Sequence, residues 1–402
     1  MIHHTSYETR DSIRCLFLVG STDEQTLEKE SYELIRQTAS DGVEVEVGVL
    51  RELSAEAMEI LHAVPLHSHI FTNKNDPFSR KRLPTLLADG GFDALVTMGG
   101  EEETFWGRFA AQRNGLSVIA SFVPSNVEVN WDNALQKMLV GGTDCFICES
   151  LQASNDLVRQ STIPAARVKT LCLGVDTDCY RSHPGQRWQL RQELGLDHAQ
   201  TVCGLVARSL NTETIEYILA ESKWAIAQSD DWRMVILGLH EDQVAAIEQR
   251  IAESQLNGKV LVRPDRGDNN VAMSVLDVYV INPTDENPRM DILRAMACGL
   301  PVTIPFDSPA DDLVVDGLCG LKHDATLNCG AKAWIDLCSN RRRRRQFGRI
   351  GQDLVVTHWS VGTAARGLRA LILNLHAAKH GPFPPAFADQ ELPVDCGAMV
   401  AL

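Results

Sequence analysis

The sequence predicts an α/β protein built from two doubly wound domains in tandem. Short apolar runs alternate with amphipathic helical segments from one end to the other, which is typical of parallel sheets with crossover helices. A length of 402 residues is long for one hydrophobic core and natural for two such domains. A turn-rich, polar segment at residues 174–185 separates the two halves of the pattern.

The expected elements follow the chain in order. In the first half, strands are predicted at residues 15–20, 44–50, 94–98, 117–122, 145–149 and 167–173, with helices that include 24–39 and 102–113. In the second half, strands are predicted at 201–207, 232–237, 259–263, 278–282 and 301–304. A helix is expected at 360–380, and residues 381–402 carry several prolines and little periodicity, which favours an irregular tail.

Composition excludes several classes of protein. A formal net charge of −15 argues against a nucleic-acid surface and against strong docking to acidic lipid. No run approaches the roughly eighteen apolar residues that a membrane helix requires. The first residues lack the apolar core of a signal peptide, so the expected location is the cytoplasm.

The eleven cysteines are spread along the chain, many of them in apolar runs, and reduced thiols are expected. Cys145 and Cys148 form a close pair, but they lie in a predicted strand where positions three apart point to opposite faces. With no second pair to complete a zinc site, no metal site is predicted there. The histidines of His67-x-His69 are expected to flank a loop at the surface, and no metal centre is predicted elsewhere.

The most informative stretch is residues 285–302, which reads as a loop, a helix and a new strand. Glu286 stands just before the helix, with Asn287 as the expected N-cap and Pro288 as the first helical residue. Four further segments accompany this stretch in a fixed order, at residues 163–178, 187–208, 232–238 and 311–321. Together they resemble glycosyltransferase family 4, over nearly all of residues 140–360.

The resemblance implies a GT-B fold, in which two Rossmann-like domains face a cleft and the last helix crosses back to the first domain. The domains would be residues 1–178 on the acceptor side and 179–360 on the nucleotide-sugar side, with the crossing helix at 361–380 and the tail at 381–402. It also implies a retaining transfer of a sugar from a nucleoside diphosphate donor, with no cofactor and no metal. The acceptor and the oligomeric state stay open.

Family roles can be carried over to individual positions. Glu286 would accept hydrogen bonds from hydroxyls of the transferred sugar, because an ionised carboxylate is a pure acceptor. Arg208 would neutralise the diphosphate, helped by the N–H groups of the helix that begins at residues 287–289. The residues placed at the donor are Arg208, Glu213, Arg263, Pro264, Glu286, Asn287, Pro288, Arg289, Met290 and Arg294, with Arg208 and Glu286 as the catalytic pair. Gly20, Gly99 and Gly100 follow strands of the first domain and are candidates for loops near donor and acceptor, although Gly99 and Gly100 could equally form a simple strand-to-helix turn.

Two positions depart from the family pattern. Arg294 stands where the family has a second Glu that accepts hydrogen bonds from the ribose hydroxyls, and a guanidinium has no acceptor. Glu213 replaces a Lys, and one charge interaction at about 4 Å is worth roughly 4 kcal/mol at an effective dielectric near 20. Because the two changes are reciprocal, an ion pair between Glu213 and Arg294 is expected.

The sequence therefore supports two functions. The first is a glycosyltransferase acting on a nucleotide sugar and a carbohydrate or other small acceptor. The second is a catalytically inactive relative, a binding or scaffold subunit that keeps the fold and has lost donor affinity. A sugar epimerase on the same architecture fits the motif order less well. The absence of a nucleophile elbow and of a G-x-G-x-x-G after any strand argues against a hydrolase and a dehydrogenase.

Overall fold

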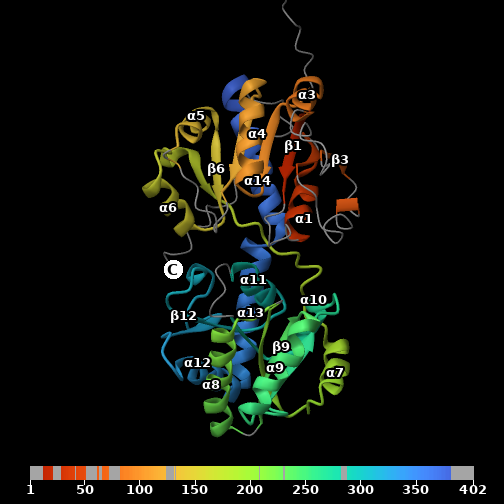
Figure 1. The fold of residues 1–402 in the computed structure, drawn as a ribbon, viewed down its shortest axis with the longest axis vertical. Helices are drawn as coiled ribbons and strands as arrows, with labels where there is room; N and C mark the ends of the chain where they lie inside the picture. The colour runs from red at the N-terminus through yellow and green to blue at the C-terminus, as the bar shows by residue number, and fades with distance from the viewer. Residues whose placement is uncertain are drawn as a thin grey trace, which may run out of the picture. The chain divides into compact units, whose positions relative to one another are not determined.

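The chain folds into two compact units (Figure 1). The computed structural model describes residues 12–20, 29–40, 42–50, 61–62, 66–71, 82–123, 131, 133–207, 209–229, 231–281 and 288–381. One unit comprises residues 1–174 and 361–402, and the other comprises residues 175–360. The division falls four residues before the boundary that the sequence predicts after residue 178. Val175 forms a bridge with Ser360, and both residues belong to the second unit.

The N-terminal unit is built on a seven-stranded parallel sheet in the order β3-β2-β1-β4-β5-β6-β7. Its strands are β1 (Ile13–Val19), β2 (Val43–Val49), β3 (His67–Ile70), β4 (Ala94–Met98), β5 (Val118–Phe122), β6 (Cys145–Cys148) and β7 (Val168–Thr170). Its helices are α1 (Lys29–Thr38), α3 (Arg82–Asp89), α4 (Glu101–Arg113), α5 (Ala134–Gly142), α6 (Leu151–Gln160) and α14 (Val361–His380), with a 3-10 turn at Ala165–Arg167.

The two faces of this sheet are covered by different helices. One face packs its alternate apolar residues against α1 and α14, which together bury side chains such as Ile35 and Leu368. The opposite face packs against α3 and α4 through residues such as Leu83 and Ala111. Figure 1 shows α14, drawn in blue, inside the N-terminal unit. Helix α14 is therefore part of the first core, although it follows the whole C-terminal unit in the sequence.

The C-terminal unit holds a six-stranded parallel sheet in the order β10-β9-β8-β11-β12-β13. Its strands are β8 (Thr201–Val206), β9 (Trp232–Leu239), β10 (Val260–Pro264), β11 (Val278–Val280), β12 (Val302–Pro305) and β13 (Gly320–His323). Its helices are α7 (Pro184–Glu193), α8 (Thr212–Gln228), α9 (Glu241–Glu253), α10 (Asn269–Ala272), α11 (Arg289–Ala297), α12 (Cys329–Ser339) and α13 (Arg341–His358), with 3-10 turns at Met273–Val275 and Asp311–Leu313.

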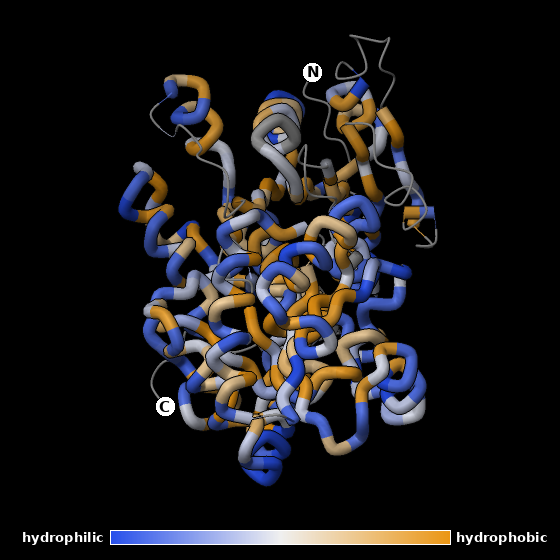
Figure 2. Tube along the Cα trace, turned by 60° about the horizontal axis from the view of Figure 1, so that its bottom comes forward, coloured by the Kyte–Doolittle hydropathy of each residue, from blue (hydrophilic) through white to orange (hydrophobic). Residues whose placement is uncertain are grey.

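The core of the C-terminal unit lies between its sheet and helices α8, α9 and α12. Trp232 of β9 and Trp334 of α12 stack at its centre with ring centroids 6.0 Å apart. In Figure 2 hydrophobic segments gather in the middle of this unit, with hydrophilic segments around them. Glu221 of α8 is fully buried in this core and accepts hydrogen bonds from the backbone N–H groups of Asn328 and Ala331 at the start of α12. The carboxylate thus caps α12 from a neighbouring helix.

Two expectations about local structure are corrected. His67 and His69 do not flank a loop: they belong to β3, a four-residue edge strand whose polar sequence gives no apolar alternation. β13, at Gly320–His323, is a further strand that was not predicted.

Every cysteine among the described residues is a free thiol, as the sequence predicts. Burial raises the pKa of Cys145 to about 12 and that of Cys148 to about 11.

None of the helices in the described ranges combines the length and apolar character needed to cross a bilayer.

Candidate functional site

The candidate site of the C-terminal unit is the carboxyl edge of its sheet, where the strand order reverses. β8 and β11 are hydrogen-bonded neighbours, with Val278 opposite Cys203, and the chain winds away from them in opposite directions. In sheets of this kind a crevice opens at that point, between the loops that leave the two strands. α8 begins at Thr212 and α11 at Arg289, so the helices that follow these two neighbouring strands both start on this side of the sheet.

The start of α11 differs by one residue from the prediction. The helix runs from Arg289 to Ala297 and Pro288 occupies the N-cap position, with its carbonyl accepting from the N–H of Ile292 at 3.0 Å. The prediction had Asn287 as the N-cap and Pro288 as the first helical residue, so the helix begins one residue later than predicted. The shift changes little chemically, because the first N–H groups of any helix lack intrahelical acceptors, whichever residue begins it.

Arg289 has a structural partner that the sequence did not indicate. Its side chain is 6% exposed, and the two Nη atoms of its guanidinium donate to the two carboxylate oxygens of Asp312, with Nη2 to Oδ2 at 3.1 Å. Asp312 lies in the 3-10 turn after β12, so the ion pair ties the beginning of α11 to the neighbouring loop. Met290 is also buried. The side chains of Arg289 and Met290 are therefore both buried at the start of α11, where they anchor the helix, rather than exposed for contact with a donor.

Arg294 is held by neighbours on two sides. Its side chain is 17% exposed, and Nη1 lies 3.1 Å from Oδ1 of Asp291, one turn earlier on α11. Its guanidinium also lies over the ring of Tyr180, 5.3 Å from the centroid, which is a cation–π geometry. Asp291 and Tyr180 are thus the residues at this position that sequence reasoning missed.

The expected ion pair between Glu213 and Arg294 is not formed between these two described side chains. Glu213 lies in the first turn of α8 and is exposed, while Arg294 has Asp291 as its carboxylate partner. The first turn of a helix favours an acid because its N–H groups carry a positive partial charge, which gives Glu213 a local reason to be acidic. The reciprocal pattern in the sequence was therefore misleading.

The loop after β10 has an internal clamp. Arg263 is 4% exposed and donates to both carboxylate oxygens of Asp268, at 2.9 and 2.8 Å. These hydrogen bonds lower the pKa of Asp268. Pro264 ends the strand, and the loop returns immediately to α10. The clamp fixes the shape of the loop that follows Arg263 and Pro264, two of the residues predicted to lie at the donor.

Gly238 allows the end of β9 to lie close to Asn269, the first residue of α10. Gly238 has a φ of 82°, and a Cβ at this position would lie 3.2 Å from each terminal atom of the Asn269 side chain. Both the left-handed backbone and the close contact favour glycine at this end of β9.

Several predicted residues fall elsewhere. Arg208, Glu286 and Asn287 lie outside the described residues. Gly20, Gly99 and Gly100 belong to the N-terminal unit, where the strand order reverses between β1 and β4. The N–H of Gly20 donates to the carbonyl of Met98 at 3.2 Å, which brings the loops after these two strands together, and Gly100 is the N-cap of α4. They therefore lie at the corresponding edge of their own sheet.

Comparison with known proteins identifies the C-terminal unit. Residues 200–339 match the family model described as glycosyl transferases group 1. Within the C-terminal unit, these residues are therefore similar to group 1 glycosyltransferases. The candidate edge, with α8 and α11, lies within the matched residues.

A curated relative and two solved structures extend the comparison. A GDP-mannose-dependent alpha-(1-6)-phosphatidylinositol monomannoside mannosyltransferase from Mycolicibacterium smegmatis is 24% identical over 229 residues, which are 54% of this chain and 59% of that protein. A glycosyltransferase from Rickettsia africae superposes with a TM-score of 0.77 at 12% identity, over 91% of this chain and 99% of that one. Anabaena HepE in complex with UDP superposes with a TM-score of 0.71 at 17% identity, over 90% and 99%. At these identities the two structures establish the fold, and the prediction of a GT-B protein with two Rossmann-like sheets is confirmed.

Proposed function

We propose that this chain is a glycosyltransferase that transfers a sugar from a nucleoside diphosphate donor to a carbohydrate or other small acceptor, with retention of configuration. The observation that carries the proposal is that β8 and β11 lie side by side at the strand-order reversal, within the residues that match the glycosyl transferases group 1 model. The N-terminus of α11 supplies N–H groups at that edge, and a diphosphate is the anion that such a terminus suits. Arg208 and Glu286, from the two loops, take the diphosphate and the sugar in this proposal.

The ion pair between Asp291 and Arg294 supplies what the altered motif lacks. A ribose hydroxyl can donate one hydrogen bond and accept another. A carboxylate and a guanidinium 3.1 Å apart offer an acceptor and donors side by side, with 26% and 17% of their side chains exposed. We therefore assign the ribose contact of the family's second Glu to this pair, with Asp291 as the acceptor.

The alternative, an inactive relative that has lost donor binding, rests on one specific observation. Arg294 is already engaged by Asp291 and by the ring of Tyr180, in the position where the family needs a free acceptor. Glu213 adds a negative charge at the beginning of α8, on the side where a diphosphate would lie. On this view the fold is kept for binding a partner and the donor site is electrostatically closed.

Donor titration separates the two functions. Isothermal titration of the full chain with nucleotide sugars, beginning with UDP-glucose and GDP-mannose, should give a saturable heat if the transferase proposal holds. Asp291→Asn should then weaken binding by about tenfold or more, since a hydrogen bond to a charged group is worth about 1.5–3 kcal/mol.

The reversed variant completes the test. If the native chain gives no heat at millimolar donor and the double variant Glu213→Lys with Arg294→Glu binds, the inactive alternative is supported. Glu216→Lys, one turn along the same helix, is the matched control for added positive charge. If neither the native chain nor the double variant binds any nucleotide sugar, both readings of this site are refuted.

A further inference from the structure

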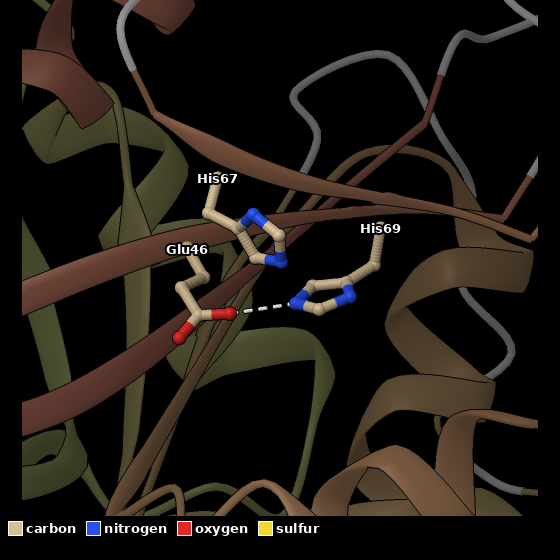
Figure 3. A group of neighbouring side chains, drawn as sticks. All are labelled: Glu46, His67 and His69. Atoms are coloured by element: carbon tan, nitrogen blue, oxygen red, sulfur yellow. Dashed lines mark hydrogen bonds and ion pairs between the residues drawn. The ribbon is translucent and has the colours of Figure 1, made fainter.

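The outer edge of the N-terminal sheet brings together two histidines and a glutamate that the proposed function does not use. Glu46 on β2 is in register with His67 on β3, and Gly48 is in register with His69. Residues paired in this way, or two apart on one strand, share a face of the sheet. All three side chains therefore project from the same face, as Figure 3 shows.

The ligand atoms of the three side chains converge. One nitrogen of each histidine and one oxygen of Glu46 all lie within 4.8 Å of one another. Nε2 of His69 is 2.6 Å from Oε2 of Glu46, and the rings of His67 and His69 are edge-to-face with centroids 4.6 Å apart. Ligands of a tetrahedral zinc ion, each at about 2.0–2.2 Å from the metal, are separated by roughly 3.3 Å. Small side-chain rotations would bring the set to that spacing.

The surroundings orient the ligands. The ring of His69 stacks on Phe71 and meets the edge of Phe92, with centroids 6.5 Å away in both cases. Arg14 donates to Oε1 of Glu46, which leaves Oε2 directed at His69. Such second-shell contacts are the usual means of fixing a metal ligand. Two parallel strands thus hold the carboxylate and one imidazole in place before any ion binds.

Charge and exposure agree with a cation that keeps a water ligand. Both oxygens of the Glu46 carboxylate have partners, since Arg14 donates to Oε1 and Nε2 of His69 lies at Oε2, and the cationic group beside it is the guanidinium of Arg14. His67 is exposed, whereas the side chains of His69 and Glu46 are 21% and 16% exposed. The open side toward His67 gives room for solvent in a fourth position.

We propose that Glu46, His67 and His69 form a Zn²⁺ site that joins the edge strand β3 to β2. Two imidazoles and one carboxylate form a donor set that zinc uses with three protein ligands and a water. The hard, oxygen-preferring ions Ca²⁺ and Mg²⁺ do not match this set. The nearby guanidinium of Arg14 opposes the cation, which makes the site weaker than one built without it. The role of the proposed zinc site is to hold β3, the short strand at the edge of the described sheet.

The test is zinc binding by the full chain after treatment with a chelator. Calorimetric titration with Zn²⁺ should show a site with one ion per chain that is lost, or weakened by about tenfold or more, in His67→Ala and in His69→Ala. Co²⁺ in place of zinc should give tetrahedral d–d absorption without a thiolate-to-metal band, because the ligands are nitrogen and oxygen. At a Zn²⁺ concentration about 100-fold above Kd, the melting temperature of the native chain should rise by about 5 °C or more.

The controls separate this site from other histidines. His380→Ala breaks the His376–His380 pair on α14, whose ring centroids are 4.5 Å apart, and should leave the zinc site intact. His67→Ala should melt like the native chain without zinc, since His67 is exposed, and should show no zinc-dependent rise. Unchanged stoichiometry and affinity in both His67→Ala and His69→Ala would overturn the proposal, as would loss of binding in His380→Ala alone.

Discussion

Gly348 gives a direct test of how the C-terminal unit holds α11 in place. In α13, a Cβ on Gly348 would lie 2.0 Å from the carbonyl oxygen of Gly299, although such contacts do not fall below 3.0 Å. Gly299 has a φ of 76° and closes α11: its N–H donates to Met296 and the next N–H to Ala295, the Schellman pattern. The clash is with a fixed backbone, so Gly348→Ala must push the two helices apart.

The cost can be estimated from two opposing effects. Overpacking an interior costs about 1–3 kcal/mol, and a clash with fixed backbone belongs at the upper end. Alanine returns about 1 kcal/mol through its higher helix propensity. We therefore expect Gly348→Ala to destabilise the C-terminal unit by about 2 kcal/mol, which lowers its melting temperature by about 4–8 °C for a unit of this size.

Gly351 is the matched control on the same helix. A Cβ there would meet side-chain atoms of Met296 at 3.5 Å, an ordinary contact. Gly351→Ala should keep the melting temperature or raise it by about 2–4 °C. Calorimetric unfolding of both variants measures the difference, and equal melting temperatures for Gly348→Ala and the native chain would show that α11 and α13 are not packed this closely.

Three further predictions concern a buried carboxylate, the ion pair after β10 and two buried thiols. Glu221→Gln should lower the free energy of unfolding by about 2 kcal/mol in denaturant titration, because a charged cap on α12 is lost. Asp268 has a folded-state pKa below its unfolded value, so its pairing with Arg263 stabilises the unit above about pH 4 and is lost as pH falls further. Asp268→Asn should therefore be destabilised relative to the native chain at pH 7, and this difference should shrink as the pH falls below about 4, as measured by thermal melts at each pH. Cys145 and Cys148 should resist a thiol reagent at pH 8 in the native state and react on unfolding, since burial raises the pKa of both; peptide mapping by mass spectrometry would detect early labelling at either residue.

Much of the fold follows from local pattern in the sequence. The strand predicted at residues 94–98 matches β4 residue for residue, because five successive apolar or small residues are buried on both faces of a central strand. β3 was missed for the opposite reason: it is a short edge strand with polar residues, and its existence depends on pairing with β2 rather than on its own sequence.

The side-chain partners in the site could not be read from the sequence. Arg289 finds Asp312 from a turn 23 residues away, and a long-range ion pair leaves no periodic signal. The reciprocal charges at positions 213 and 294 suggested a pair, but Asp291 lies one helical turn from Arg294 and is therefore its nearer carboxylate. Spacing of three on a helix was the available clue. It was outweighed by the comparison with the family motif.

These pairings change which charges a donor can use. Three arginines that the sequence places at the donor, Arg263, Arg289 and Arg294, each have an aspartate partner within the same unit. Breaking a buried pair leaves an uncompensated charge, so Arg263 and Arg289 are held to their structural roles at 4% and 5% exposure. In the proposed transferase the leaving diphosphate must then be stabilised by Arg208 and by the N–H groups of α11, while the Asp291–Arg294 pair faces the ribose. Removing the negative charge of Glu213 should therefore raise donor affinity more than adding a cation elsewhere. The three arginines are already neutralised by aspartates, so the charge of Glu213 repels an anion without compensation from them.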